Sequence, residues 1–163
     1  MSYRLACELT DKIAAIAPVA ASMSDFLYYN CAPSEPISVL FIMGTEDPLM
    51  PWEGGEIRFG RLRLGRVVSA FKTVQFWAEY NECISESRRR YLPDKAPSDG
   101  TRVWRKRYAR CNGGTEVILL GIEGGGHTWP GGLQYLPERI IGKTCRDIDA
   151  CEVIWSFFRR HSK

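Results

Sequence analysis

The sequence predicts an α/β fold with a mostly parallel sheet, an antiparallel edge hairpin and flanking helices. Short runs of consecutive apolar residues at 13–20, 37–43 and 117–122 are typical of strands covered on both faces. Apolar residues also recur at helical spacing over 66–81 and 150–160. With 163 residues, 45% of them hydrophobic, the chain is expected to form one domain with a substantial core.

The first half of the chain should place an acidic residue at the end of a strand. A helix is expected over residues 1–12, although no capping residue precedes it. In the following apolar run, Pro18 lacks an amide hydrogen, which suits a strand end or edge. The clearest buried strand, 37–43, stops at the sequence GTEDP (residues 44–48), so Asp47 is expected at its carboxyl end.

The second half is expected to supply the rest of the sheet and its covering helices. The aromatic stripe of the helix over 66–81 is read as core. Residues 101–110 intersperse Trp and Tyr with Lys and Arg, as in an edge strand guarded by positive charge. The turn sequence NGG (residues 112–114) predicts a hairpin between this strand and residues 115–122.

Composition limits the partners and groups that the chain is expected to bind. The net charge is only +3, so nucleic-acid binding through residues 102–110 ranks last among the functions considered. No apolar run approaches the roughly 20 residues of a membrane span, and the first residues lack the pattern of a signal peptide. We therefore expect neither a nucleic-acid nor a membrane partner.

The cysteines predict a disulfide rather than a metal centre. None of the six forms a Cys-x-x-Cys pair, so no metal and no cofactor is expected. Cys83 and Cys111 bracket a loop and a strand in a way that suits a disulfide in an oxidising compartment.

His127 is the main candidate for chemistry. It lies in the segment GGGHTWPGG (residues 124–132), directly after the apolar run 117–122. The glycines allow sharp turns and close backbone approach, and Trp129-Pro130 stiffens the exit, so the imidazole should be held in place. The other histidine, His161, lies in a basic C-terminal tail and is expected to be solvated.

Asp47 and His127 together suggest a catalytic acid and base. Functional groups of such sheets collect beyond the carboxyl ends of the strands. An acid that orients an imidazole, which serves as base to a nucleophile, is the logic of a Ser-His-Asp triad. Asp47 alone could simply form a turn before Pro48. With His127 in the same chain we favour the catalytic interpretation.

These segments resemble the polyhydroxybutyrate depolymerase-like and feruloyl-esterase-like branch of the α/β-hydrolases. The glycine-rich His127 segment carries most of the resemblance. It implies that Asp47 is the triad acid, that His127 is the base and that Trp129 lines the acyl or alcohol pocket. It also implies a secreted parent protein. The supporting segments are MSYRLACE (1–8), IAPVA (16–20), GTEDP (44–48) and DIDA (147–150).

The sequence departs from this family at the nucleophile. In the family a serine in a Gly-x-Ser-x-Gly elbow lies just ahead of the helix that here begins at Met1. This sequence contains no Gly-x-Ser-x-Gly. We therefore expect residues 1–163 to form a single truncated domain, the C-terminal portion of such a hydrolase.

Two expectations follow from this departure. The strand around Ile16 would present an unpaired edge, which favours a homo-oligomer, a dimer or larger. Ester hydrolysis would also need a substitute nucleophile. Ser22 and Ser24 follow that strand and are the main candidates, with Ser2 as a weaker third, although each could be an ordinary structural serine.

The leading hypothesis is a carboxylic ester hydrolase for short acyl or aryl esters. His127 would be the base, Asp47 would orient it, and Ser22 or Ser24 would attack. In a variant of this hypothesis another subunit supplies the serine. The alternative is a catalytically silent hydrolase fragment that serves as an oligomeric interaction module.

Overall fold

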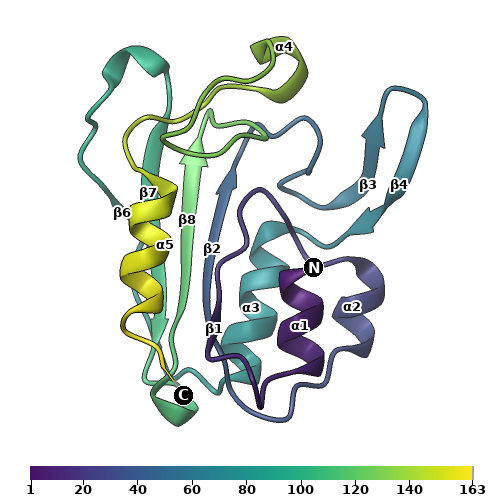
Figure 1. The fold of residues 1–163 in the computed structure, drawn as a ribbon, viewed down its shortest axis with the longest axis vertical. Coiled ribbons are helices and arrows are strands. Elements are labelled where there is room, and N and C mark those ends of the chain that lie inside the picture. The colour runs from purple at the N-terminus through teal and green to yellow at the C-terminus, as the bar shows by residue number, and fades with distance from the viewer. Residues whose placement is uncertain (163) are drawn as a thin grey trace.

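The computed structural model describes residues 1–162 and has an α/β architecture with a mixed sheet (Figure 1). The sheet has the order β1-β2-β8-β7-β5, and β6 also pairs with β7. β1, β2 and β8 are parallel, whereas β7 is antiparallel to β8, β5 and β6. The expectation of a mostly parallel sheet is therefore not confirmed, because β5 and β6 pair antiparallel with β7 in addition to the expected β7–β8 hairpin.

Five α-helices and eight strands lie within residues 1–162. The α-helices are α1 (Ser2–Glu8), α2 (Asp25–Asn30), α3 (Ala70–Tyr80), α4 (Glu138–Ile141) and α5 (Ala150–Phe158). Short 3-10 turns occupy Pro97–Asp99 and Asn112–Gly114. The strands are β1 (Ala15–Ile16), β2 (Ser38–Gly44), β3 (Gly55–Phe59), β4 (Leu62–Val67), β5 (Ser85–Glu86), β6 (Arg90–Tyr91), β7 (Arg102–Ala109) and β8 (Val117–Glu123).

Strands β2 and β8 form the centre of the core. Every residue of β2 is buried, as are all residues of β8 except Glu123. Alternate side chains enter two apolar clusters, one on each face of the sheet. Phe41 packs in the cluster that contains Trp77 of α3, and Leu40 in the cluster that contains Phe157 of α5. The continuous apolar runs thus predicted strands covered on both sides.

Several predicted elements are shorter in the structure. The first helix ends at Glu8 instead of residue 12. Regular pairing in the next strand is limited to two residues, and a single bridge between Val19 and Ile42 continues it beyond Pro18. The helix predicted from residue 66 begins at Ala70, because the Ser69 side chain caps it and the preceding residues belong to β4.

The hairpin of β3 and β4 was not predicted. Its residues carry arginines and glycines among the apolar positions, and its strands are half-buried or exposed until Val67. Apolar and charged residues do alternate on both sides of Gly60, at Ile57, Phe59, Leu62 and Leu64, so the sequence carried a hairpin signal that our prediction did not use. The β7–β8 hairpin was predicted and is confirmed.

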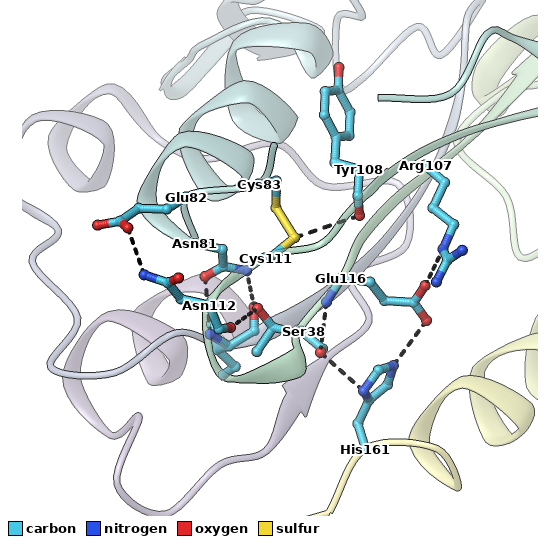
Figure 2. The surroundings of a disulfide bond; sticks show 12 residues. Ser38, Asn81, Glu82, Cys83, Arg107, Tyr108, Cys111, Asn112, Glu116 and His161 are labelled. Atoms are coloured by element: carbon cyan, nitrogen blue, oxygen red, sulfur yellow. Dashed lines mark hydrogen bonds and ion pairs between the residues drawn. A yellow bond between two sulfur atoms is a disulfide. The ribbon is translucent and has the colours of Figure 1, made fainter. Parts of the chain in front are cut away.

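Two disulfides cross-link segments that flank the sheet. The predicted bond between Cys83 and Cys111 is present and lies beside Asn81 at the end of α3 (Figure 2). A second bond, which the sequence did not indicate to us, joins Cys7 of α1 to Cys31 after α2. Cys145 and Cys151 are free thiols.

No helix within residues 1–162 has both the length and the apolar character that crossing a membrane requires.

The disulfide assignment predicts a thiol count. Titration of the denatured, unreduced protein should find two free thiols out of six cysteines. Replacing Cys83 and Cys111 together by Ser should lower the free energy of unfolding by about 2–4 kcal/mol, because the unfolded chain loses a cross-link. Replacing the exposed Cys151 by Ser is the control and should change stability little. Six titratable thiols in protein purified without reductant would contradict the assignment.

Candidate active site

The pairing of β2 with β8 brings Asp47 and His127 together. The strands are parallel neighbours, so the segments that follow them leave the same edge of the sheet. Two backbone hydrogen bonds extend the contact beyond the strands, from the amide of Thr45 to the carbonyl of Ile122 and from Glu46 to Gly125. The segments that follow β2 and β8 thus remain hydrogen-bonded to each other where they leave the sheet.

Glycine is required where these segments touch. A Cβ atom on Gly44 would lie 2.1 Å from the carbonyl oxygen of Gly125. One on Gly126 would lie 2.1 Å from the carbonyl oxygen of Ile141, in the segment that closes over the loop. Since real Cβ atoms do not approach backbone oxygen so closely, the glycines in this motif serve close backbone packing. The backbone of the His127 loop therefore packs directly against two segments, those that contain Gly44 and Ile141.

Asp47 uses its two carboxylate oxygens for different purposes. Oδ1 accepts hydrogen bonds from the backbone amides of Leu49 and Met50, at 2.8 and 2.7 Å. Oδ2 lies 2.9 Å from Nδ1 of His127. Turn formation and imidazole orientation, which the sequence presented as alternatives for Asp47, are thus both fulfilled by this one side chain.

The environment of the pair favours a protonated His127. The Asp47 side chain is fully buried, and that of His127 is 31% exposed. The hydrogen bond with Asp47 raises the pKa of His127 above its usual 6.5 and outweighs the opposing effect of burial. Since Asp47 occupies Nδ1, the neutral ring carries its proton there and keeps Nε2 as the basic atom.

Two further contacts hold the backbone of His127, and the sequence did not reveal them to us. The His127 amide donates to the carbonyl of Ile141, and the hydroxyl of Tyr135 donates to the carbonyl of His127 at 2.9 Å. Tyr135 follows His127 by only eight residues, but no spacing rule links a loop tyrosine to a backbone carbonyl. Trp129, predicted to line a substrate pocket, is 43% exposed, and that role stays a prediction.

The structure does not bring the candidate serines into contact with the imidazole. The hydroxyl of Ser22 is buried and donates weakly to the sulfur of Met43 at 3.4 Å. Ser24 caps α2 by accepting from the amide of Leu27. Ser2 is the first residue of α1. Within residues 1–162 no serine hydroxyl is hydrogen-bonded to His127, so the identity of the nucleophile stays a prediction.

The expectation that His161 is solvated was wrong. Its side chain is 12% exposed. Nδ1 lies 3.1 Å from the hydroxyl of Ser38, and Nε2 lies 3.1 Å from the carboxylate of Glu116 (Figure 2). Burial acts to raise the pKa of Glu116, but hydrogen bonds from Arg107 and His161 outweigh it and lower that pKa. These contacts fasten the C-terminal tail to the amino ends of β2 and β8.

Metal ligands do not accompany the Asp47–His127 pair. In the part of the chain that the structure describes, no three His, Cys, Asp or Glu side chains are grouped to hold a metal ion. A cavity of about 320 Å³ lies elsewhere, between α5 and the sheet. Its lining combines apolar residues, such as Leu40 and Phe157, with charged ones, such as Arg105 and Glu152.

Two curated proteins resemble this chain in sequence. A protein named "Putative esterase NocK" from Nocardia uniformis subsp. tsuyamanensis is 30% identical over 163 residues, which cover 96% of this chain and 47% of the relative. Feruloyl esterase B from Piromyces equi is 30% identical over 129 residues, which cover 78% of this chain and 22% of the relative. The chain thus spans about half of the first relative and about a fifth of the second. No protein-family model matches the sequence.

The geometry predicts how His127 titrates. Its imidazole should show a pKa above 6.5 by NMR, with the resonance assigned through a His127→Gln variant. In Asp47→Asn the hydrogen-bonding charge is lost while burial remains, so the pKa of His127 should fall.

Asp11→Asn removes an exposed carboxylate elsewhere and is the matched control for charge. The pKa of His127 should not change in that variant. A pKa that is the same in Asp47→Asn as in the unmodified protein would contradict the assigned role of Asp47.

Proposed function

We propose that this chain carries the acid and base of a carboxylic ester hydrolase. The observation on which the proposal rests is the 2.9 Å contact between Asp47 and Nδ1 of His127, each placed after one of two adjacent parallel strands. This order, acid before base, and the placement at strand ends are those of an α/β-hydrolase. The two esterase-named relatives support the same reaction class.

In the proposed reaction Nε2 of His127 takes the proton of an attacking hydroxyl. Asp47 fixes the tautomer that leaves Nε2 free and stabilises the imidazolium that forms. The hydroxyl oxygen bonds to the ester carbonyl carbon, and the imidazolium then protonates the departing alcohol. Water, activated by the same nitrogen, releases the acid and restores the hydroxyl. No cofactor enters this scheme.

Of the two candidate nucleophiles within the chain, Ser22 would lose the weaker hydrogen bond when its hydroxyl is freed to attack. To attack, Ser24 would give up its cap on α2, which is worth about 1 kcal/mol. Ser22 would give up only a weak hydrogen bond to a thioether sulfur. A hydroxyl supplied by another polypeptide is the third possibility, and the open edge of β1 is the proposed oligomer contact through which it could arrive.

We propose short acyl or aryl esters as substrates. The name of the second relative, feruloyl esterase B, supports an ester with an aromatic acyl group. Trp129, two residues beyond the base and partly exposed, is the proposed wall of the acyl or alcohol pocket. Each oxyanion donor that is missing would cost about 3 kcal/mol in the transition state, so turnover by this chain alone should be slow.

A silent interaction module is the second candidate. It is favoured by the absence, within the described residues, of any serine hydroxyl bonded to His127. In that case the Asp47–His127 pair would serve only to hold the loop.

Hydrolysis of p-nitrophenyl acetate tests the proposal. Removal of the base in His127→Ala should reduce kcat/KM by about a thousandfold or more, because the attacking hydroxyl loses its proton acceptor. Activity should rise with pH through the raised pKa of His127, since only the neutral ring accepts a proton.

His161→Gln removes the other histidine and is the control, expected to keep its activity. A fluorophosphonate probe followed by peptide mapping identifies the serine. Turnover that persists unchanged in His127→Ala would refute the proposed mechanism. Absence of both turnover and labelling in the unmodified chain would favour the silent module.

A further inference from the structure

The β3–β4 hairpin is an element that the proposed reaction does not use. Its two strands form a separate sheet that pairs with no strand of the main sheet. Figure 1 shows it projecting from the molecule beside the carboxyl end of β2. A bridge between Ser24 and Val67 holds its base, and Gly54 packs against the backbone of Val68 and Ser69. The tip has no such support.

The pairing places three large apolar side chains together near the tip. Phe59 is directly opposite Leu62, and Leu64 lies two residues further along the same strand, on the same face. They are 53%, 62% and 61% exposed. Gly60, with a φ of 59°, forms the turn between the strands. The most hydrophobic part of the hairpin is thus also its most accessible part.

The other face of the hairpin is basic. Arg58 is paired with Arg63, and a register shift beside them leaves Arg66 opposite Glu56. Glu56 forms ion pairs with Arg58 and Arg63, and Asp25 of α2 forms one with Arg66. The guanidinium-bearing side chains remain at least 63% exposed in these pairs, so they stay available to another partner.

The hairpin is basic, although it is not the most basic stretch of the chain, since residues 102–110 carry five Lys and Arg and no acidic residue. Residues 55–67 contain four of the 22 Lys and Arg residues but only one of the 19 Asp and Glu residues. Its own charge of +3 therefore equals the net charge of the whole chain, and the remainder is balanced. Charged side chains alone would protect the hairpin from pairing with the edge of another sheet. The three exposed apolar side chains therefore indicate a contact surface.

We propose that the β3–β4 hairpin docks this chain on an anionic lipid surface. Inserted tip first, Phe59 and Leu62 would enter the acyl region while the arginines remain at the level of the phosphates. A second copy of the hairpin is a poor partner, because it would bring a second set of arginines to the contact. Nucleic acid would match the arginines but leave the apolar tip exposed to water.

The docked hairpin would hold the candidate active site near the lipid. The hairpin follows Asp47 by only a few residues and lies at the same end of the sheet as His127. The sequence-based expectation of no membrane partner considered only spanning segments, and the proposal replaces it with contact at the surface. The docking does not depend on the proposed ester hydrolysis.

Vesicle co-sedimentation tests the proposal with the full chain. Binding to vesicles of phosphatidylcholine with phosphatidylglycerol should exceed binding to phosphatidylcholine alone and should weaken with salt. Replacing Phe59, Leu62 and Leu64 together by Ser should reduce the partition coefficient at least about tenfold. The charge variant Arg58→Gln/Arg63→Gln/Arg66→Gln, which removes the three arginines of the basic face, should do the same.

The matched control removes three exposed arginines elsewhere, as Arg88→Gln/Arg139→Gln/Arg159→Gln, so that net charge is equal. It should retain more than half of the binding. As an independent measure, the indole in Phe59→Trp should be quenched by brominated lipid.

Several outcomes would overturn the proposal. These are equal binding to neutral and anionic vesicles, equal loss in the control and the hairpin charge variant, or no quenching of the indole. Light scattering that finds an oligomer dispersed by the Phe59, Leu62 and Leu64 changes, with no vesicle binding, would instead assign the hairpin to contact between copies.

Discussion

The parallel register between β2 and β8 pairs Val39 with Val117 and carries on to Gly44 and Ile122. Asp47 and His127 are 80 residues apart in sequence, and this pairing is what makes their side chains neighbours. Both strands are buried on both faces, so a shift of register by one residue would turn core side chains toward the opposite cluster. The relative position of Asp47 and His127 is therefore fixed by core packing.

Beyond the strand ends, glycine packing and hydrogen bonds hold the segments of Asp47 and His127 in place. Glycines at positions 44 and 126 let the backbone segments pack without intervening side chains. The amides of Leu49 and Met50 hold one oxygen of Asp47, which leaves the second directed at the imidazole. A buried carboxylate with both oxygens occupied is held in one orientation. That restraint is what a general base needs from its acid partner.

The opposite end of the sheet is stabilised by a separate set of polar contacts. His161, Ser38 and Glu116 link the C-terminal tail to the beginnings of β2 and β8, and the Cys83–Cys111 disulfide joins α3 to the β7–β8 turn (Figure 2). These contacts lie at the end of the sheet opposite to the loops that carry Asp47 and His127. The two histidines thus occupy opposite ends of the same pair of strands and have different roles.

The sequence by itself predicted the strands at 37–43 and 117–122 and the helix over 150–160, and it singled out Asp47 and His127, whose catalytic roles stay a proposal. Local patterns were sufficient there, because continuous apolar runs and a glycine-rich His segment reflect burial and close backbone approach directly. Only the tertiary structure decided that β5 and β6 add antiparallel strands beside β7, that Ser22 and Ser24 are hydrogen-bonded elsewhere and that the side chain of His161 is largely covered. These outcomes depend on contacts between residues distant in sequence, such as Ser22 with Met43 and His161 with Glu116. The tertiary structure also decided that the apolar face of the β3–β4 hairpin is exposed to solvent and not packed on the core.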